Sequence, residues 1–362
     1  MSECTERSEG RERMPQRHRV SRTRRTRLVL AAAAALLGGC SSTPEPAPRP
    51  SPTPSPSPRF DAPPVAVATN PGPFRAGPVV APTTGAYLGA WARPQELTQE
   101  GRLAAIGELE EDLGRPLDIV NTYRRFDEPA GTESDHEFVA QGVTLMISWA
   151  SADTRAVVSG QHDKLIRAQA QRVRAIRAPV LLRFRWEMDR PNLRATMWSP
   201  ADYIAAWRHV RAIFAAERVG NVSWVWCPTA EGFVRGDAPA FYPGDDAVDW
   251  TCVDVYAGNV FRPLGELMGP FLTWAAQRPK PIVVGEFGVA RAWGPDGRAA
   301  WLRDAARVFK ANPQIKAVAY FESDPDGNGP RQQFQLSDDR TAMKAFTELT
   351  RDPYFRPRRP PR

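Results

Sequence analysis

The sequence predicts a single (β/α)8 barrel, and three observations support this fold class. Eight short apolar runs, rich in β-branched and aromatic residues, lie between residues 86 and 321. Amphipathic segments separate them, as at residues 97–113, 163–176, 200–217 and 299–309. Near-continuous apolar strands that alternate with helices are typical of a parallel sheet covered by helices. The span of about 265 residues suits a barrel, for which ~250 residues is usual.

The expected strands lie at residues 86–91, 117–123, 143–149, 180–186, 222–227, 253–256, 282–286 and 315–321. An open doubly wound sheet is the alternative fold. It usually carries a glycine-rich phosphate-binding turn directly after its first strand. Here residues 85–91, GAYLGAW, run on without such a turn, which favours the barrel.

The first 39 residues have the pattern of an export signal. Basic residues at 22–27 precede an apolar stretch at 28–39 that is too short to span a bilayer as a helix. This stretch ends in LGGCSS, which resembles the lipobox of bacterial lipoproteins, where a cysteine is acylated and becomes the new N-terminus. Cys40 is therefore the expected lipidation site, and an ordinary signal peptide with a chance cysteine is the alternative.

Proline dominates the segment that follows Cys40. Residues 44–82 contain 14 prolines in 39 positions, and such a composition favours an extended polyproline conformation without a core. We expect residues 40–84 to be an acylated, disordered linker, residues 85–350 to be the barrel, and residues 351–362 to be an Arg/Pro-rich tail. A lipid anchor with a spacer predicts an extracytoplasmic protein held at the cell membrane.

The charge distribution argues against nucleic acid as a partner. The chain has a net charge of +7, but residues 1–39 hold nine Arg against four Glu and so account for +5 of it. Residues 351–362 hold five further Arg against one Asp. A nucleic-acid-binding face needs clustered Lys and Arg on the folded domain itself. We therefore expect no nucleic-acid partner, and we expect a monomer.

Two cysteines, Cys227 and Cys252, fall on neighbouring strands of the predicted barrel. An exported protein matures where disulfides persist, so a bridge between them is one interpretation, and two buried free thiols are the other. A zinc site would need nearby histidines, but the four His of the chain are scattered. The sequence therefore predicts neither a metal site nor a cofactor.

Two glutamates come directly after apolar strands, at the barrel edge where active sites are built. The fourth strand leads into Glu187 and the seventh into Glu286. A single charge at such a position is commonly a salt bridge or a helix cap. Two carboxylates on separate strands predict a catalytic pair.

Two motifs surround these glutamates, Arg-x-x-x-Glu-Met at residues 183–188 and Gly-Glu-Phe-Gly at residues 285–288. They resemble glycoside hydrolase family 26, the β-mannanase family within the retaining (β/α)8 glycosidases. Further agreement in order and spacing lies at residues 160–163, 198–203, 224–228, 242–249 and 254–256, and the resemblance covers roughly residues 85–350. It implies that Glu187 is the acid/base, Glu286 the nucleophile, and Tyr256 a hydroxyl that steadies the nucleophile.

The chemistry of these residue types agrees with the implied roles. A retaining glycosidase needs two carboxyl groups ~5–5.5 Å apart, one to protonate the leaving oxygen and one to attack the anomeric carbon. A nearby carboxylate and the ring of Trp186 would keep Glu187 protonated before reaction. We expect the glycines at 285 and 288 to leave room for a sugar ring beside Glu286.

Aromatic residues at the strand ends predict a cleft that binds sugar rings. Flat apolar faces with polar edges suit pyranose rings, although core filling is the alternative for each of the 11 Trp. Arg183 is a candidate electrostatic partner of the carboxylates, with a structural ion pair as its alternative role. The candidate substrate-binding residues are Trp91, Tyr123, Trp149, Arg183, Trp186, Asp189, Trp226, Tyr256 and Phe321.

Four residues depart from the family pattern. Trp186 stands where the family usually has His, Asp189-Arg190 replaces the usual Asn-Gly, and Phe321 replaces a Trp platform.

The predicted function is endo-acting hydrolysis of a β-glycosidic bond in a polysaccharide by double displacement. A β-mannan-like polymer is the preferred substrate, and other β-glucans, xylans or an exopolysaccharide of the producing organism are the next candidates. The alternatives are an inert polysaccharide-binding barrel and a transglycosylase that uses the same carboxylates.

Overall fold

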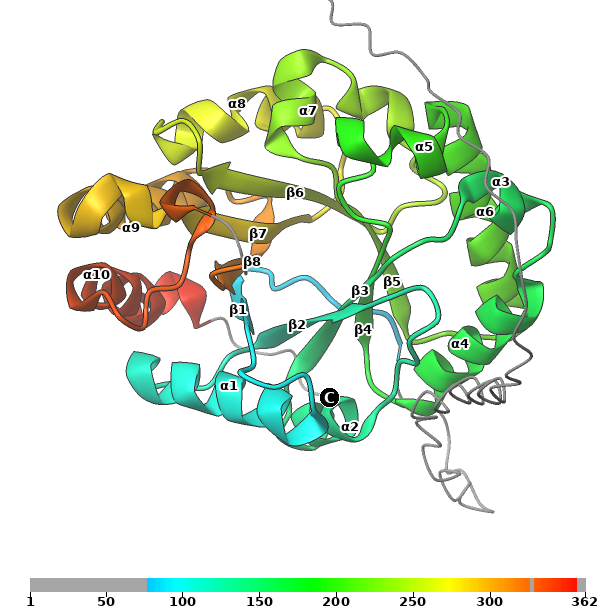
Figure 1. The fold of residues 1–362 in the computed structure, drawn as a ribbon, viewed down its shortest axis with the longest axis horizontal. Helices are drawn as coiled ribbons and strands as arrows, with labels where there is room; N and C mark the ends of the chain where they lie inside the picture. Colours follow the sequence, from blue (N-terminus) through cyan, green and yellow to red (C-terminus); the bar gives the residue numbers. More distant parts are fainter. Residues whose placement is uncertain (1–76, 326–328, 357–362) are drawn as a thin grey trace, which may run out of the picture. The chain divides into compact units, whose positions relative to one another are not determined.

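The computed structural model describes residues 77–325 and 329–356. Within this part of the chain, eight parallel strands close into a barrel in the order β1-β2-β3-β4-β5-β6-β7-β8, and helices surround it (Figure 1). The predicted (β/α)8 fold is confirmed. The expected export signal, Cys40, the linker up to residue 76 and the tail from residue 357 lie outside the described residues.

All eight strands coincide with the apolar runs, with ends displaced by at most three residues. They are β1 (Tyr87–Ala92), β2 (Ile119–Arg124), β3 (Thr144–Trp149), β4 (Val180–Phe184), β5 (Val222–Trp226), β6 (Trp250–Ala257), β7 (Ile282–Val289) and β8 (Ile315–Glu322).

The principal helices are α1 (Gln99–Leu113), α2 (Glu133–Ala140), α3 (Thr154–Val158), α4 (Asp163–Ala175), α5 (Arg194–Met197), α6 (Pro200–Ala216), α7 (Ala230–Arg235), α8 (Leu264–Ala275), α9 (Gly294–Ala311) and α10 (Arg340–Arg351). Short 3-10 helices supplement them at η1 (Pro191–Leu193), η2 (Ala238–Phe241), η3 (Arg291–Trp293), η4 (Pro330–Gln332) and η5 (Pro353–Phe355). No helix in the described ranges combines the length and apolarity needed to cross a membrane.

Local sequence signals set the ends of the helices beside the cleft. The Ser199 hydroxyl accepts a hydrogen bond from the Asp202 amide, and Pro200 occupies the first turn of α6, a combination that favours helix initiation. Thr229 caps α7 in the same way, and Gly236 ends that helix in the left-handed conformation. The helix that follows β5 is therefore only six residues long, which keeps its loop close to the barrel mouth.

Residues before β1 close the bottom of the barrel. The Val79 amide donates to Ser223 Oγ at 2.9 Å, and the Tyr87 hydroxyl donates to Val80 O at 3.2 Å. Val79 packs with interior side chains such as Ile119 and Leu181. The predicted disordered linker up to residue 84 is therefore wrong at its C-terminal end, because an apolar side chain there fills the open end of the barrel.

The fold also extends past residue 350, into the segment expected to be a tail. The Ala86 amide donates to Tyr354 O at 3.0 Å, and Arg115 Nη1 donates to Phe355 O at 2.7 Å. Phe355 is fully buried and meets Phe309 of α9 edge to face. The predicted boundary at 350 is wrong because η5 packs against the start of β1 and the end of α9.

We predict that Phe355→Ala lowers the free energy of unfolding by about 3 kcal/mol, because truncating a buried Phe loses apolar contacts and leaves a cavity. Urea denaturation would measure the change. Phe261→Ala is the matched control, since Phe261 is 43% exposed, and we expect it to cost less than about 1 kcal/mol. Equal effects of the two substitutions would contradict the assignment of Phe355 to the core.

Candidate active site

A cleft of about 1290 Å³ opens at the carboxyl ends of the strands. Both candidate catalytic glutamates, Glu187 and Glu286, lie on its wall. Five of the seven predicted aromatic residues also line it, namely Trp91, Tyr123, Trp186, Tyr256 and Phe321. The structure thus brings most of the predicted site residues into one cleft.

Glu286 lies within β7, which continues to Val289, rather than just after the strand as predicted. The pairing of β7 shifts register against β6 between Val253 and Asp254, and again against β8 after Val284. Such irregularities redirect side chains locally. They accompany the placement of Glu286 at the cleft wall, where it is 5% exposed.

Three donors hold the Glu286 carboxylate. The Tyr123 hydroxyl and Arg183 Nη2 both donate to Oε1, and the Tyr256 hydroxyl donates to Oε2. These donors come from β2, β4 and β6, so three separate strands fix the orientation of one carboxylate. Burial raises the pKa of Tyr256, and the charge of Glu286 raises it further, so this hydroxyl keeps its proton and remains a donor.

Arg183 is fully buried beneath the cleft and is saturated with partners. Its Nε donates to Ser148 Oγ at 2.8 Å, and its Nη1 donates to both oxygens of Asp254 at 2.7 and 2.9 Å. Burial alone would lower the pKa of Arg183, but Asp254 and Glu286 raise it above its ordinary value. The guanidinium is therefore a permanent positive charge below Glu286.

Glu187 sits on a strained turn at the end of β4. Arg185 and Glu187 have φ values of 44° and 53°, in the left-handed region that non-glycine residues rarely adopt. Two hydrogen bonds hold the turn, from the Arg185 amide to Trp149 O at 2.8 Å and from the Glu187 amide to Cys227 O at 2.7 Å. Backbone strain of this kind concentrates at functional sites, and here it turns Glu187 toward the cleft.

The surroundings of Glu187 raise the pKa of its carboxyl to about 7. Burial is the largest cause, and the negative charge of Glu286 adds to it. Arg190 opposes both, because its Nη1 lies 2.7 Å from Glu187 Oε2. The carboxyl group can therefore hold a proton near neutral pH, as a general acid must.

The carboxylates lie close together. One oxygen each of Glu187, Asp254 and Glu286 falls within 4.8 Å of the others. Such a group resembles a set of metal ligands, but Arg183 already donates to both Asp254 and Glu286, so a guanidinium supplies the positive charge there. The geometry thus places the protonatable carboxyl group of Glu187 opposite the carboxylate of Glu286, which accepts hydrogen bonds from three donors.

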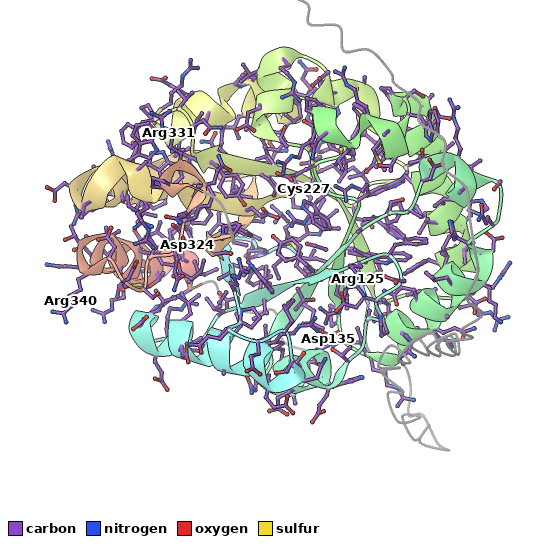
Figure 2. All side chains as sticks on the ribbon, in the orientation of Figure 1. Arg125, Asp135, Cys227, Asp324, Arg331 and Arg340 are labelled. Atoms are coloured by element: carbon purple, nitrogen blue, oxygen red, sulfur yellow. A yellow bond between two sulfur atoms is a disulfide. The ribbon has the colours of Figure 1, made fainter. Side chains whose placement is uncertain are left out.

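Cys227 and Cys252 form a disulfide under this cluster, which decides between the two alternatives for these cysteines. Cys227 follows β5 and Cys252 belongs to β6, and Cys227 is labelled inside the ring of helices in Figure 2. Both residues are fully buried. With their sulfurs bonded to each other, they offer no thiolate to a metal.

The two glycines beside Glu286 make room for protein side chains, not for a sugar ring as expected. A Cβ at Gly285 would lie 2.6 Å from Cys252 Sγ and 2.7 Å from Arg183 Nη1. A Cβ at Gly288 would lie 3.1 Å from both Phe334 and Tyr256. These glycines allow the disulfide, the guanidinium and the tyrosine to approach the backbone of β7.

Trp149 and Trp226 do not line the cleft, and the expectation that they bind substrate is wrong. Both are fully buried between the barrel and the helices. Trp149 stacks on Phe126 at 5.3 Å, and Trp226 donates to Phe241 O at 3.1 Å. The inward positions of their strands hold Ser148, which accepts from Arg183, and Ser223, which accepts from Val79. Alternation along each strand therefore turns both tryptophans outward, toward the helices.

Asp189 is also buried and does not line the cleft, so its predicted role in substrate binding is wrong. Its Oδ1 accepts from the Thr229 amide at 3.0 Å, and its Oδ2 accepts from the Thr229 hydroxyl. Arg235 lies 3.4 Å from the same carboxylate. Asp189 therefore ties the loop after β4 to the start of α7, which is a positioning role.

The sequence analysis did not assign a role to Asp254, the main partner of Arg183. A signal was present, because Asp254 is the only charged residue in the apolar segment of β6, WTCVDVYA. Ser148 and Asn121 carry the same kind of signal on β3 and β2, and Ser148 Oγ donates to Asn121 Oδ1 at 2.7 Å. Polar residues at inward positions of apolar strands mark the layer that supports the site.

We predict that Glu187→Gln stabilises the protein above pH 7 and loses this advantage below about pH 4.5. A carboxyl whose folded-state pKa is raised from 4.5 to about 7 destabilises the fold as pH rises through that window, by up to roughly 3 kcal/mol. Urea denaturation of both proteins at pH 4.5 and pH 8 would measure the difference.

The exposed Glu348→Gln serves as its control and should change stability by less than about 0.5 kcal/mol at either pH. A Glu187→Gln protein that is less stable than the wild type at pH 8 would contradict the raised pKa.

Several curated proteins are similar in sequence to this chain. Endoglucanase H of Acetivibrio thermocellus is 27% identical over 266 residues, which cover 66% of this chain and 28% of that protein. A β-1,3-xylanase of an Alcaligenes species is 26% identical over 202 residues, which cover 54% of this chain and 40% of that protein. The matches thus span less than half the length of these relatives.

The fold is shared with solved structures. A GH26 β-mannanase from Bacteroides ovatus superimposes with a TM-score of 0.58 at 17% identity, over 75% of this chain and 90% of that one. Residues 119–278, which include β4 with Glu187 and all of β6, match the model of Glycosyl hydrolase family 26. The resemblance to glycoside hydrolase family 26 indicated by the sequence is thereby confirmed over residues 119–278.

Proposed function

We propose that this protein is a retaining, endo-acting glycoside hydrolase that cleaves β-glycosidic bonds of a polysaccharide by double displacement. The observation that carries the proposal is the pair Glu187 and Glu286, which have oxygens within 4.8 Å of each other at the wall of an aromatic-lined cleft. This spacing suits the ~5–5.5 Å separation of carboxyl groups in retaining enzymes and leaves too little room for the water that an inverting enzyme needs.

In the first step, a Glu286 oxygen attacks the anomeric carbon of the sugar. The bond from that carbon to the leaving oxygen breaks, and Glu187 gives this oxygen its proton. The hydroxyls of Tyr123 and Tyr256 and the guanidinium of Arg183 hold the Glu286 carboxylate in one orientation. Holding the reacting atoms in one orientation lowers the free-energy barrier of the reaction.

In the second step, Glu187 is ionised and acts as a base. It takes a proton from a water molecule whose oxygen attacks the anomeric carbon, and the bond to Glu286 breaks. Arg190, at 2.7 Å from Glu187, stabilises the ionised form during this step. Two inversions at the same carbon leave the product with the configuration of the substrate.

The cleft lining supports a polysaccharide substrate. Trp91, Trp186 and Phe321 present ring faces or edges around the carboxyl pair, and aromatic surfaces of this kind pack against pyranose rings. The family match favours a β-linked polymer. We propose a β-mannan-like backbone first, with glucan and xylan backbones next, in line with the names of the endoglucanase and xylanase relatives.

We predict that Glu286→Ala lowers kcat on an activated aryl β-glycoside by about 10⁴-fold or more, and that azide restores turnover. Azide can enter the space left by the carboxylate and attack the anomeric carbon directly, which gives an α-glycosyl azide. Glu187→Ala should instead give a β-glycosyl azide, because azide then attacks the sugar bound to Glu286. Proton NMR of the azide products distinguishes the two outcomes.

Glu348→Ala, an exposed surface substitution, is the control and should retain wild-type turnover. Azide products of the opposite configurations would reverse the two roles. Tight polysaccharide binding by wild type and by Glu286→Ala, with no sugar release from either, would show that the protein binds polysaccharide and does not hydrolyse it. Products longer than the substrate would identify a transglycosylase.

We also propose that the protein is exported and anchored to the cell membrane through Cys40. The basic and apolar pattern of residues 22–39, the LGGCSS motif and the proline-rich spacer support this proposal. An anchored barrel on a spacer would meet polymer outside the cytoplasm.

We predict that Cys40→Ala moves the protein from the membrane fraction to the soluble extracytoplasmic fraction, because its lipid attachment site is lost. Fractionation with immunoblotting, together with mass spectrometry of the N-terminal peptide, would measure this. A Ser41→Ala protein is the control and should stay in the membrane fraction. Unmodified Cys40 in the wild-type protein would contradict the proposal.

A further inference from the structure

The described lining of the cleft holds more positively charged than negatively charged side chains. Three of its charged residues are acidic, of which Glu187 and Glu286 form the catalytic pair. Five are arginines, while no Lys or Asp belongs to the described lining. The lining charges are Arg93, Arg185, Arg190, Arg235 and Arg262 against Glu187, Glu231 and Glu286.

Three of these arginines have partners whose charge does not change in the proposed reaction. Arg235 pairs with Asp189 and Asp237. Arg93 donates to Asp324 O at 3.0 Å, and Arg185 lies over the Trp186 ring at 5.0 Å. Arg190 pairs instead with the catalytic Glu187.

Arg262 is exposed on the loop after β6, at the cleft. Its guanidinium makes no hydrogen bond, ion pair or ring contact with the described part of the chain, although its carbonyl accepts from Trp301. An arginine without a partner beside a binding cleft is available to an anionic ligand.

Among the described residues, Arg190 pairs with Glu187 alone, at 2.7 Å, and its side chain is 51% exposed. Its partner changes charge during the proposed reaction. When Glu187 carries the proton for the leaving oxygen, Arg190 loses its counter-charge while it faces the cleft. A negative group on the substrate would restore that counter-charge at the moment when it is missing.

We propose that the cleft binds an anionic β-glycan, whose sugars carry carboxylate or sulfate groups, with one anion on Arg190 beside the leaving oxygen and a second within reach of Arg262. The proposal rests on the hydrolase function above and names its substrate class. Guanidinium groups bind carboxylate and sulfate oxygens through paired hydrogen bonds. An anion on Arg190 also weakens its pull on Glu187, so that the acid keeps its proton until the bond breaks.

The test compares oligosaccharides that differ only in charge. The full-length Glu286→Gln protein, which binds without turnover, is titrated by calorimetry with β-1,4-mannohexaose and with the β-1,4-mannuronan hexamer, in which a carboxylate replaces each hydroxymethyl group. We expect at least ~10-fold tighter binding of the acidic hexamer in low salt, and a smaller difference in 0.5 M NaCl because salt screens the charges. Sulfated mannohexaose separates a general anion preference from a carboxylate preference.

Adding Arg190→Gln to this protein should remove most of the preference, and adding Arg262→Gln should remove part of it. Adding Arg307→Gln, on the outer surface of α9 and 76% exposed, is the control and should leave the preference unchanged. Equal affinities for the neutral and acidic hexamers, or a preference that survives loss of both cleft arginines, would overturn the proposal.

Turnover by the protein with Glu286 intact provides a second readout. On mannohexaose, Arg190→Gln should shift the alkaline limb of kcat/KM to higher pH, because the arginine no longer lowers the pKa of Glu187. Anion-selective binding without hydrolysis of either hexamer would reject the hydrolase and keep the anion site. Hydrolysis of mannohexaose without anion preference would keep the hydrolase and reject the anion site.

Discussion

The ion pairs of one buried arginine organise the whole site. Arg183 extends from β4 into the barrel and binds Ser148 of β3, Asp254 of β6 and Glu286 of β7. Burial raises the pKa of Asp254 well above its usual value, and Arg183 opposes that effect. Without the guanidinium, the two neighbouring buried carboxylates would repel each other, and burial would favour the protonated form of Asp254. The position of Glu286 therefore depends on an arginine that is fully buried and does not line the cleft, contrary to its predicted role in substrate binding.

The same strand also places the second glutamate. β4 ends at Phe184, and the left-handed residues Arg185 and Glu187 then turn the chain over the mouth. The carbonyl of Cys227 accepts a hydrogen bond from the Glu187 amide. Cys227 also forms a disulfide with Cys252 under Arg183. Arg183 and the disulfide thus support both carboxyl groups from below. A small displacement of this support would alter the distance between the two carboxyl groups.

The sequence predicts the barrel and the carboxyl pair because both depend on patterns along the chain. Apolar runs locate the strands, and Glu187 and Glu286 stand out as charges at strand ends. Alternation along β3 turns Trp149 toward the helices, because its neighbour Ser148 faces inward. Trp186 lies past the end of β4, between the left-handed residues Arg185 and Glu187, where the alternation of a strand no longer applies, so the sequence alone does not place it in the cleft. The packing of Val79 and Phe355 was not predicted, because each lies in a very short apolar stretch of a proline-rich or arginine-rich segment and its contacts are with distant parts of the chain.

The contact between Arg190 and Glu187 has opposite effects in the two proposed steps. A general acid needs a high pKa, which burial and Glu286 supply and Arg190 reduces. A general base needs its ionised form stabilised, and in the glycosyl-enzyme Glu286 is esterified, so that Arg190 is the nearest charge left for this purpose. An arginine beside the acid therefore favours the second step at the expense of the first. A substrate anion that occupies Arg190 before the first bond breaks, and leaves with the departing sugar, would remove this conflict.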